Sequence, residues 1–291
     1  MTDNTSTYIR DIRKPGTFAV LPAACDSHCH IFGPGHSFPY APSVTPPPDA
    51  GKEAMFKMNA TIGVERRIIV QTVNHGYDHS VVIDAWRAKP ETTRAIALVP
   101  LGVSDEKLRH LNDHGFRGVR FHLTANLAGG ETPDAILAFA QRLAKIGWHI
   151  QLHIDEAGLE AAETMIAASP VAVVLDHLGY PDASRGLDQP GFQRVLKLMG
   201  KNRHVWAKTS GVERASRQGY PYEDAWPFAR TLVQNFGDRV LWGTDWPHPK
   251  VSGGAPDDGL LMELVAQYAP TKAERQALLV DNPDRLFWIG V

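Results

Sequence analysis

The stretch 171–176 reads VAVVLD and the stretch 66–71 reads RRIIVQ, and in both the apolar residues follow one another without alternating with polar positions. This pattern is typical of strands in a parallel sheet, which are covered on both faces. Similar runs recur along the chain and helix-like stretches separate them, so the sequence predicts parallel β-α units. The eight predicted strands are Ala24–His30, Ile68–Gln71, Arg94–Pro100, Gly118–His122, His149–His153, Val171–Asp176, His204–Thr209 and Val240–Asp245.

Eight β-α units in about 250 residues are the number found in a (β/α)8 barrel. A doubly wound open sheet is the alternative, but it would usually place a Gly-rich phosphate turn after its first strand. Here the first strand runs into CDSHCHIFG (25–33), which lacks a GxGxxG motif. We therefore expect an α/β fold with a single (β/α)8 (TIM) barrel domain over residues 18–291, preceded by a polar N-terminal tail over residues 1–17. The predicted helices are Asp49–Val64, Tyr77–Lys89, Ser104–His114, Thr132–Lys145, Glu156–Ala168, Gly191–Gly200, Tyr222–Phe236, Asp257–Tyr268 and Lys272–Leu279.

The composition argues against several classes of protein. The chain has 291 residues, with 30 Lys and Arg against 32 Asp and Glu and a formal net charge of −2. A protein that binds nucleic acid or an anionic membrane would show a basic excess, and no apolar run approaches the ~20 residues that span a bilayer. Residues 1–7 lack the apolar core of a secretory signal. Because Cys25 and Cys29 are the only cysteines, the sequence favours a cytoplasmic location, where thiols stay reduced.

Polar side chains gather at the ends of the predicted strands. Barrel enzymes build their active sites at the carboxyl ends of their strands, and the helix-like stretches here contain far fewer histidines. This enrichment is the main sign of an active site that the residues themselves give. The polar residues at these ends are His28, His30, Gln71, Asn74, His75, Arg120, His122, His153, Asp176, His177, Lys208, Thr209, Ser210, Asp245 and His248.

His28 and His30 in the motif DSHCH are two residues apart, so in a strand both point to one side, ~6–7 Å apart along the chain. They could share a metal ion or a substrate oxygen, although two wetted histidines are the simpler interpretation of an isolated HxH. Asp245 in WGTDWPHP (242–249) ends an apolar run, where a carboxylate is costly to bury alone. It could cap the next segment, but the histidines at the other strand ends favour a general base or a metal ligand.

Asp176 and His177 are adjacent, so they point to opposite faces if the strand continues through both. We expect His177 to point inward and Asp176 to support the structure, and the reverse assignment stays open. Arg120 follows an apolar residue in GVRFH (118–122). A planar guanidinium at a barrel mouth suits a carboxylate anion, and an ion pair with a neighbouring strand is an equal alternative.

These motifs resemble the amidohydrolase superfamily, and within it the 2-pyrone-4,6-dicarboxylate lactonase-like group. The likeness extends over nearly the whole chain, from DSHCHIFGP through VRF, GWHIQL, LDHLG and WGTDWPHP to DNPDRLFW. The resemblance implies a distorted barrel, small carboxylated lactones as substrates and no required metal. It also implies roles for individual residues: Asp245 would activate water, His28, His30 and His177 would polarise the lactone carbonyl, and Arg120 and Arg214 would bind substrate carboxylates.

Four features depart from the pattern of that group. Asn126 stands where the group has a second arginine, His153 where it has a tyrosine, and Val73 where it has a small hydroxyl residue. The group also has a tyrosine in the loop that here reads SVTPPPDA (43–50), where no tyrosine aligns. An amide offers a donor and an acceptor and suits hydroxyls better than a carboxylate. We therefore expect a hydroxylated sugar-diacid lactone, with Asn126, His153 and Asn74 as further substrate contacts. A related group of the same branch, galactarolactone isomerase, resembles this description. The resemblance implies isomerisation of galactaro-1,5-lactone to the 1,4-lactone, as a step of sugar-acid (galacturonate) breakdown, in which a substrate hydroxyl replaces water.

Other functions stay open. The site could instead hydrolyse 2-pyrone-4,6-dicarboxylate or a similar carboxylated lactone. We expect no cofactor to be required, but a sound set of ligands for one divalent metal such as zinc is present, so a zinc-dependent amidohydrolase is a further alternative. That set is His28, His30, His153 and Asp245. A carboxylate-binding protein without activity would be expected to lose the charged residues at the strand ends, and this chain retains them. The sequence does not predict the oligomeric state.

Overall fold

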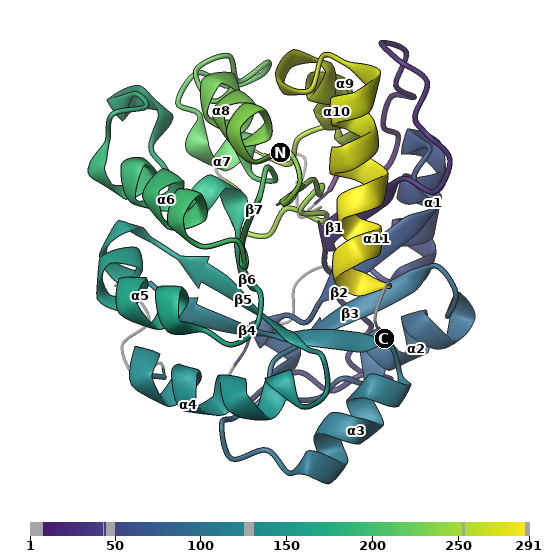
Figure 1. Ribbon diagram of the computed structural model, residues 1–291. Helices are drawn as coiled ribbons and strands as arrows, with labels where there is room; N and C mark the ends of the chain where they lie inside the picture. The colour runs from purple at the N-terminus through teal and green to yellow at the C-terminus, as the bar shows by residue number, and fades with distance from the viewer. Residues whose placement is uncertain (1–7, 43, 45–49, 125–130, 252–253, 289–291) are drawn as a thin grey trace.

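The computed structural model describes residues 8–42, 44, 50–124, 131–251 and 254–288, and it shows a barrel of strands enclosed by helices (Figure 1). Within these residues, eight parallel strands lie in the order β1 to β8, each hydrogen-bonded to the next along the chain. The predicted (β/α)8 fold is therefore confirmed. The strands are β1 (Cys25–Cys29), β2 (Arg66–Val70), β3 (Thr93–Ala97), β4 (Phe116–Leu123), β5 (His149–Ile154), β6 (Val173–Leu175), β7 (Val205–Lys208) and β8 (Val240–Leu241).

The barrel is distorted where its first and last strands meet. β8 spans two residues, against the predicted Val240–Asp245, because the chain beyond Leu241 leaves the strand to form a turn. Backbone hydrogen bonds then join this turn to β1 and the residue after it, and they close the barrel beside the HxH motif. The three bonds run from Ser27 N to Trp242 O (2.9 Å), from Asp245 N to His28 O (2.7 Å) and from His30 N to Trp246 O (2.7 Å).

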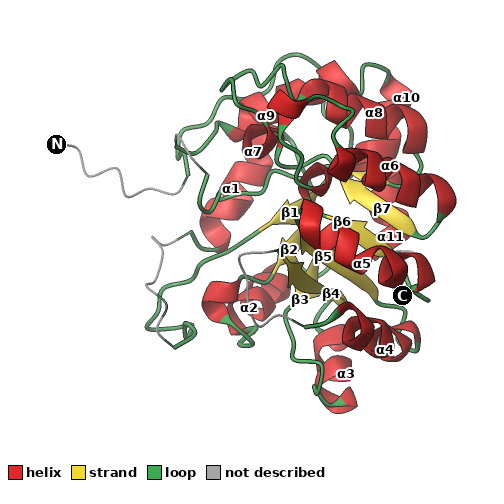
Figure 2. Ribbon diagram, turned by 90° about the vertical axis from the view of Figure 1, so that its left-hand side faces the viewer, coloured by secondary structure: helices red, strands yellow, loops and turns green. Residues whose placement is uncertain are grey.

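Helices cover the outside of the strands in both views (Figure 1 and Figure 2). Polar residues begin several of them: the Thr132 side chain accepts from Ala135 N at α4, and Thr271 and Glu274 form a capping box at α10. The short helices α7 and α11 were not predicted. No helix in the described part of the chain is long and apolar enough to cross a membrane. The helices are α1 (Lys52–Ile62), α2 (Ser80–Ala88), α3 (Asp105–Asp113), α4 (Pro133–Ala144), α5 (Glu156–Ala168), α6 (Pro190–Lys201), α7 (Val212–Ala215), α8 (Trp226–Phe236), α9 (Asp258–Tyr268), α10 (Lys272–Gln276) and α11 (Asn282–Phe287), with the 3-10 turns η1 (Val73–His75), η2 (His177–Gly179) and η3 (Ala183–Arg185) and the π-helical turn η4 (Ala277–Asp281).

Side chains on the strands alternate between the helical coat and the barrel interior. On β5, Ile150 and Leu152 belong to the main apolar core, and Gln151 takes the alternate, inward position between them. On β7, Trp206 belongs to a second apolar cluster that Phe287 of α11 completes. Lys208 follows two residues later and faces the same side. The interior therefore changes from apolar to polar toward the carboxyl ends of the strands.

Residues 8–17 contact the barrel, which differs from the polar tail predicted over residues 1–17. The rings of Tyr8 and Trp246 lie 4.9 Å apart between centroids. Arg13 N donates to both carboxylate oxygens of Asp257, at 3.1 and 3.0 Å, just before α9. One aromatic ring and backbone donors thus attach a segment whose side chains are mostly polar, and residues 1–7 lie outside the described residues.

Candidate active site

A pocket of about 340 Å³ opens at the carboxyl ends of the strands. Most of the expected site residues line it. His28 lies beneath the pocket and is fully buried, and Asn126 falls outside the described residues. The expected residues in the lining are His30, Asn74, Arg120, His153, His177, Arg214 and Asp245.

The turn after β8 places Asp245 at the floor of the pocket. Gly243 permits this path, because a Cβ at that position would lie 2.6 Å from His28 N. Asp26 of β1 holds the turn, since Thr244 Oγ1 donates to Asp26 Oδ2 (2.6 Å) and Thr244 N donates to Asp26 Oδ1 (3.0 Å). Asp245 has a φ of 65°, a conformation that residues other than glycine adopt only where their surroundings hold it. The segment WGTD (242–245) and Asp26, the first residue of DSHCH, therefore position the Asp245 carboxylate together.

Three imidazoles face the Asp245 carboxylate. Asp245 Oδ1 lies 3.3 Å from His30 Nε2, 3.6 Å from His28 Nε2 and 3.9 Å from His177 Nε2. The Nε2 atoms of His28 and His30 lie 3.3 Å apart. The four residues expected to be catalytic are thus brought into one buried cluster.

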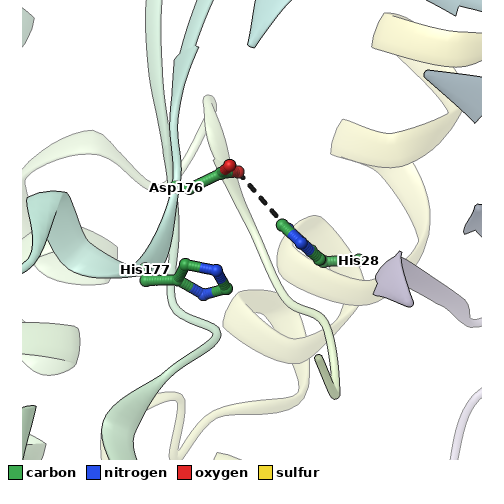
Figure 3. Close-up of side chains that lie close together, drawn as sticks. All are labelled: His28, Asp176 and His177. Carbon is green, nitrogen blue, oxygen red and sulfur yellow. Dashed lines mark ion pairs between the residues drawn. The ribbon is translucent and has the colours of Figure 1, made fainter. Parts of the chain in front are cut away.

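Asp176 and His177 approach His28 from the same side of the barrel (Figure 3). β6 ends at Leu175 and His177 has a φ of 48°, so the strand does not continue and the expected opposite faces do not apply. Asp176 Oδ1 lies 3.3 Å from His28 Nδ1, and the ring centroids of His177 and His28 are 4.6 Å apart. His177 points inward, and Asp176 belongs to the same cluster as well as supporting it.

Asp176 is fully buried and lies between two cations. Arg120 Nε donates to Asp176 Oδ2 (2.9 Å), and Lys208 Nζ lies 3.5 Å from Asp176 Oδ1. Burial alone would raise the pKa of Asp176, but Arg120 and Lys208 outweigh burial and hold the pKa well below its usual range. Arg120 therefore forms an ion pair, as in the alternative expectation, but its partner follows β6, which is not the strand next to β4, and Arg120 lines the pocket as well.

Arg214 on α7 pairs with Asp245. Arg214 Nε donates to Asp245 Oδ2 (2.6 Å), and Arg214 Nη2 contacts the same oxygen. Burial alone would raise the pKa of Asp245, but Arg214 and the nearby imidazoles hold it well below its usual range, so the carboxylate is ionised at neutral pH. If Arg214 also binds a substrate carboxylate, as expected, its guanidinium must contact that carboxylate and Asp245 at the same time.

His153 contacts Arg120, away from the Asp245 carboxylate. Arg120 Nη2 donates to His153 Nδ1 (2.9 Å), and Tyr180 Oη lies 3.1 Å from the same nitrogen. Burial, and then the charge of Arg120, lowers the pKa of His153 to about 4 and that of His122 to about 3. Both imidazoles are therefore neutral at pH 7. This wall of the pocket offers neutral donors and acceptors beside one guanidinium.

Two groups of three candidate metal ligands occur among the described residues: His28, His30 and Asp245, and His28, Asp176 and His177. His153, expected as a fourth ligand with the first group, belongs to neither, and its Nδ1 accepts from Arg120.

The first group fits one divalent ion. Its three facing atoms, the Nε2 atoms of His28 and His30 and Asp245 Oδ1, are 3.3, 3.3 and 3.6 Å apart. Such spacings suit a tetrahedral ion with bonds of ~2.0–2.1 Å. His30 Nδ1 donates to Val70 O (2.7 Å), which leaves the lone pair on His30 Nε2 available to a metal.

Three polar residues of the site had no role assigned from the sequence, although Lys208 and His122 stand among the strand-end residues that mark an active site. Lys208 is 0% exposed and contacts His28, while His122 and Tyr180 line the pocket. VWAK (205–208) ends an apolar strand with a charge, as the segment before Asp245 does, so a sequence signal for Lys208 was present. Tyr180 is placed by the irregular turn after β6, which no pattern in the sequence indicates.

Comparisons with known proteins agree with this architecture. A family model described as Amidohydrolase matches residues 25–289. A 2-pyrone-4,6-dicarboxylate hydrolase of Comamonas testosteroni is 41% identical over 278 residues, covering 92% of this chain and 91% of that protein. A 4-sulfomuconolactone hydrolase of Rhizobium radiobacter is 36% identical, covering 94% of this chain and 93% of that protein. A D-galactarolactone isomerase of Agrobacterium fabrum is 29% identical, covering 95% of this chain and 96% of that protein.

Solved structures share the fold. A crystal structure of a protein from Agrobacterium tumefaciens, without ligand, has a TM-score of 0.80 at 28% identity and covers 94% of this chain and 98% of that one. An amidohydrolase from Burkholderia multivorans with bound zinc has a TM-score of 0.71 at 17% identity and covers 91% of this chain and 98% of that one. At that identity the likeness concerns the fold alone.

The comparisons test two expectations taken from the sequence, the family resemblance and the activity. The resemblance drawn from DSHCH, LDHLG and WGTDWPHP is confirmed. The hydrolases, at 41% and 36% identity, are closer than the isomerase at 29%. The hydrolase alternative is therefore better supported than the isomerase favoured above, because similarity along nearly the whole chain outweighs a few departures at single positions.

Proposed function

Because the chain belongs to the amidohydrolase family, whose model matches residues 25–289, we propose that it hydrolyses a small lactone that carries acid groups, with 2-pyrone-4,6-dicarboxylate as the first candidate. The observation that carries the proposal is the Asp245 carboxylate, which faces three histidine Nε2 atoms at the floor of the pocket. The hydrolase that is 41% identical supports this class of substrate.

In this proposal Asp245 activates water. The carboxylate is ionised, so it accepts a proton from a water molecule whose oxygen attacks the lactone carbonyl carbon. A C–O bond forms and the carbonyl electron pair moves onto the oxygen. The oxyanion needs donors, which those facing imidazoles that carry a hydrogen on Nε2 supply. Collapse of the intermediate breaks the ring C–O bond, and the ring oxygen leaves with the proton as the open-chain acid forms.

Cations of the wall recognise the acid groups of the substrate. Arg120 is fixed by Asp176 and His153, so little conformational entropy is lost when its guanidinium meets a carboxylate. Lys250 is exposed and lines the same pocket, and it provides a second positive charge. Beside Arg214, which pairs with Asp245, these two cations line the pocket and suit a lactone with two acid groups.

The residues that would hold a divalent ion are His28, His30 and Asp245, and such an ion would supply a Lewis acid for the carbonyl. Our expectation that no cofactor is required stays a proposal. It is supported by Lys208 and Arg214, whose positive charges already lie beside His28 and Asp245.

Isomerisation of galactaro-1,5-lactone to the 1,4-lactone is the second candidate. The neutral imidazoles of His122 and His153 favour it, because neutral donors and acceptors suit hydroxyl groups. A substrate hydroxyl would then attack in place of water, and the same floor would stabilise the oxyanion. The proposed contact through Asn126 lies outside the described residues.

Proton NMR of the purified protein with each lactone tests the proposal. The protein is incubated with 2-pyrone-4,6-dicarboxylate and, separately, with the two galactarolactones, before and after chelation of metals. The expected result is ring opening of the pyrone, undiminished by the chelator. Interconversion of the galactarolactones with an unchanged pyrone would favour the isomerase, and no turnover of any of them would contradict both candidates.

A further inference from the structure

We propose that Lys208 is a positioning residue that keeps the hydrogen of the His28 imidazole on Nε2, where it points to the Asp245 cluster. The inference concerns a buried lysine to which the proposed chemistry assigns no step. It rests on the proposed function in one respect only, namely that the Nε2–H group of His28 stabilises the oxyanion of the lactone reaction.

Lys208 lies inside the barrel with its ammonium group held from two sides. Lys208 Nζ donates to Gln151 Oε1 (2.8 Å) and lies 3.1 Å from His28 Nδ1. An ammonium group has hydrogens to donate and no lone pair. His28 Nδ1 must therefore be the acceptor in this contact, and a neutral imidazole that accepts at Nδ1 carries its hydrogen on Nε2.

The neighbouring imidazole, in its neutral form, favours the same arrangement. His30 Nδ1 lies 2.7 Å from Val70 O, and a carbonyl oxygen only accepts, so His30 donates from Nδ1 and keeps a lone pair on Nε2. His28 Nε2 lies 3.3 Å from that lone pair. If His28 carries a hydrogen on Nε2, it can donate that hydrogen to the lone pair on His30 Nε2. If His28 Nε2 carries a lone pair instead, the two lone pairs face each other.

Asp176 is the partner that the alternative tautomer would have. Its Oδ1 is 3.3 Å from His28 Nδ1, slightly farther than Lys208 Nζ at 3.1 Å. Its Oδ2 already accepts from Arg120 (2.9 Å) and Gln151 (3.2 Å). The two arrangements of His28 therefore differ in one partner, Lys208 or Asp176, and the geometry favours Lys208.

The position of this hydrogen decides what the floor of the pocket can hold. With the hydrogen on Nε2, His28 is a donor aimed at the place where the proposed oxyanion forms. With the hydrogen on Nδ1, the Nε2 lone pair joins those of His30 and Asp245 as a metal ligand. Lys208 thus opposes metal binding through the tautomer of His28 as well as through its charge.

The test combines imidazole nitrogen NMR with zinc binding. Long-range ¹⁵N–¹H spectra of the whole protein identify the protonated nitrogen of His28, with His28→Gln used to assign its signals. Lys208→Met keeps the length of the side chain and removes the donor. Lys52→Met is the matched control, because Lys52 pairs with Asp84 (2.5 Å) outside the active-site pocket.

The expected result is a hydrogen on Nε2 in the wild type and in Lys52→Met, and on Nδ1 in Lys208→Met. Lys208→Met should also bind zinc at least about tenfold more tightly in calorimetry, because one nearby positive charge and one competing hydrogen are removed. Hydrogen on Nδ1 in the wild type, an unchanged tautomer in Lys208→Met, or unchanged zinc affinity would each overturn the inference. The wild-type spectrum decides even if Lys208→Met does not fold. A protein that shows the Nε2 hydrogen but opens no lactone would contradict the proposed function alone.

Discussion

The floor and the wall of the pocket differ in how firmly the protein holds their polar groups. On the floor, His28, Asp176 and Lys208 are 0% exposed and Asp245 is 1% exposed, and each contacts several charged or imidazole groups. On the wall the imidazoles are only partly buried, and Val73 at the rim is 51% exposed. The floor comes mainly from strands and the turns just after them, and part of the wall comes from loops.

This contrast separates the reaction from the choice of substrate. We infer that the floor fixes carbonyl attack as the reaction, and that the wall selects which lactone undergoes it. A change on the floor should lower kcat for every substrate, because it removes stabilisation of a shared transition state. A change on the wall should alter KM for one lactone relative to another. The predictions below test this separation.

Asp245→Asn should have the largest effect. Loss of the proposed base should reduce kcat by ~10²–10⁴-fold for every lactone that the protein accepts. Steady-state kinetics on two lactones measures this. Asp105→Asn is the matched control, since Asp105 accepts from Arg142 (3.1 Å) on the outside of the barrel. A loss below tenfold, or an equal loss in the control, would show that Asp245 is not the base.

Arg120→Met should weaken the binding of a carboxylated lactone by ~2–4 kcal/mol, because a desolvated guanidinium contact is lost. KM should therefore rise about 30- to 1,000-fold. The variant also leaves buried Asp176 without its Nε partner, and breaking such a pair costs ~3–5 kcal/mol of stability. Thermal unfolding is therefore measured beside KM, and Arg120→Lys retains the charge. A folded variant with unchanged KM would remove Arg120 from substrate binding.

Sequence patterns were sufficient for the fold and for much of the floor. Apolar runs gave the strands, and HxH, LDHLG and WGTD marked the strand ends, because strand periodicity and burial constrain these residues locally. Partners across the barrel were not predictable in this way. Arg214 meets Asp245 beyond the ends of the neighbouring strands β7 and β8, 31 residues apart in the sequence. Lys208 meets His28 across the closure of the barrel, 180 residues apart. His153 meets Arg120 between the paired strands β4 and β5 and belongs to neither group of candidate metal ligands.

Arg214→Met should move the acid limb of the activity profile to higher pH. Arg214 holds the pKa of Asp245 below its usual range, against burial, which raises it. Without the guanidinium the pKa rises, so the carboxylate becomes protonated and inactive at a higher pH than in the wild type. The dependence of kcat/KM on pH measures the shift. An acid limb at the same pH as in the wild type would show that Asp245 does not govern it.

His122→Phe should have the smallest effect. This neutral imidazole of the wall can lose one substrate hydrogen bond, worth ~0.5–1.5 kcal/mol, or about 2- to 12-fold in KM. The effect should differ between the pyrone dicarboxylate and a hydroxylated lactone, and kcat should stay close to the wild-type value. Competition between the two lactones in one reaction measures the ratio directly. An equal fall in kcat for both would place His122 with the floor.

Hydrolysis in ¹⁸O-labelled water tests the central claim most directly. If Asp245 activates water against the carbonyl of 2-pyrone-4,6-dicarboxylate, mass spectrometry of the first turnover should find one ¹⁸O atom in the new carboxylate of the opened product. An unopened pyrone, together with galactaro-1,5-lactone that becomes the 1,4-lactone without ¹⁸O, would contradict the account and show that a substrate hydroxyl takes the place of water.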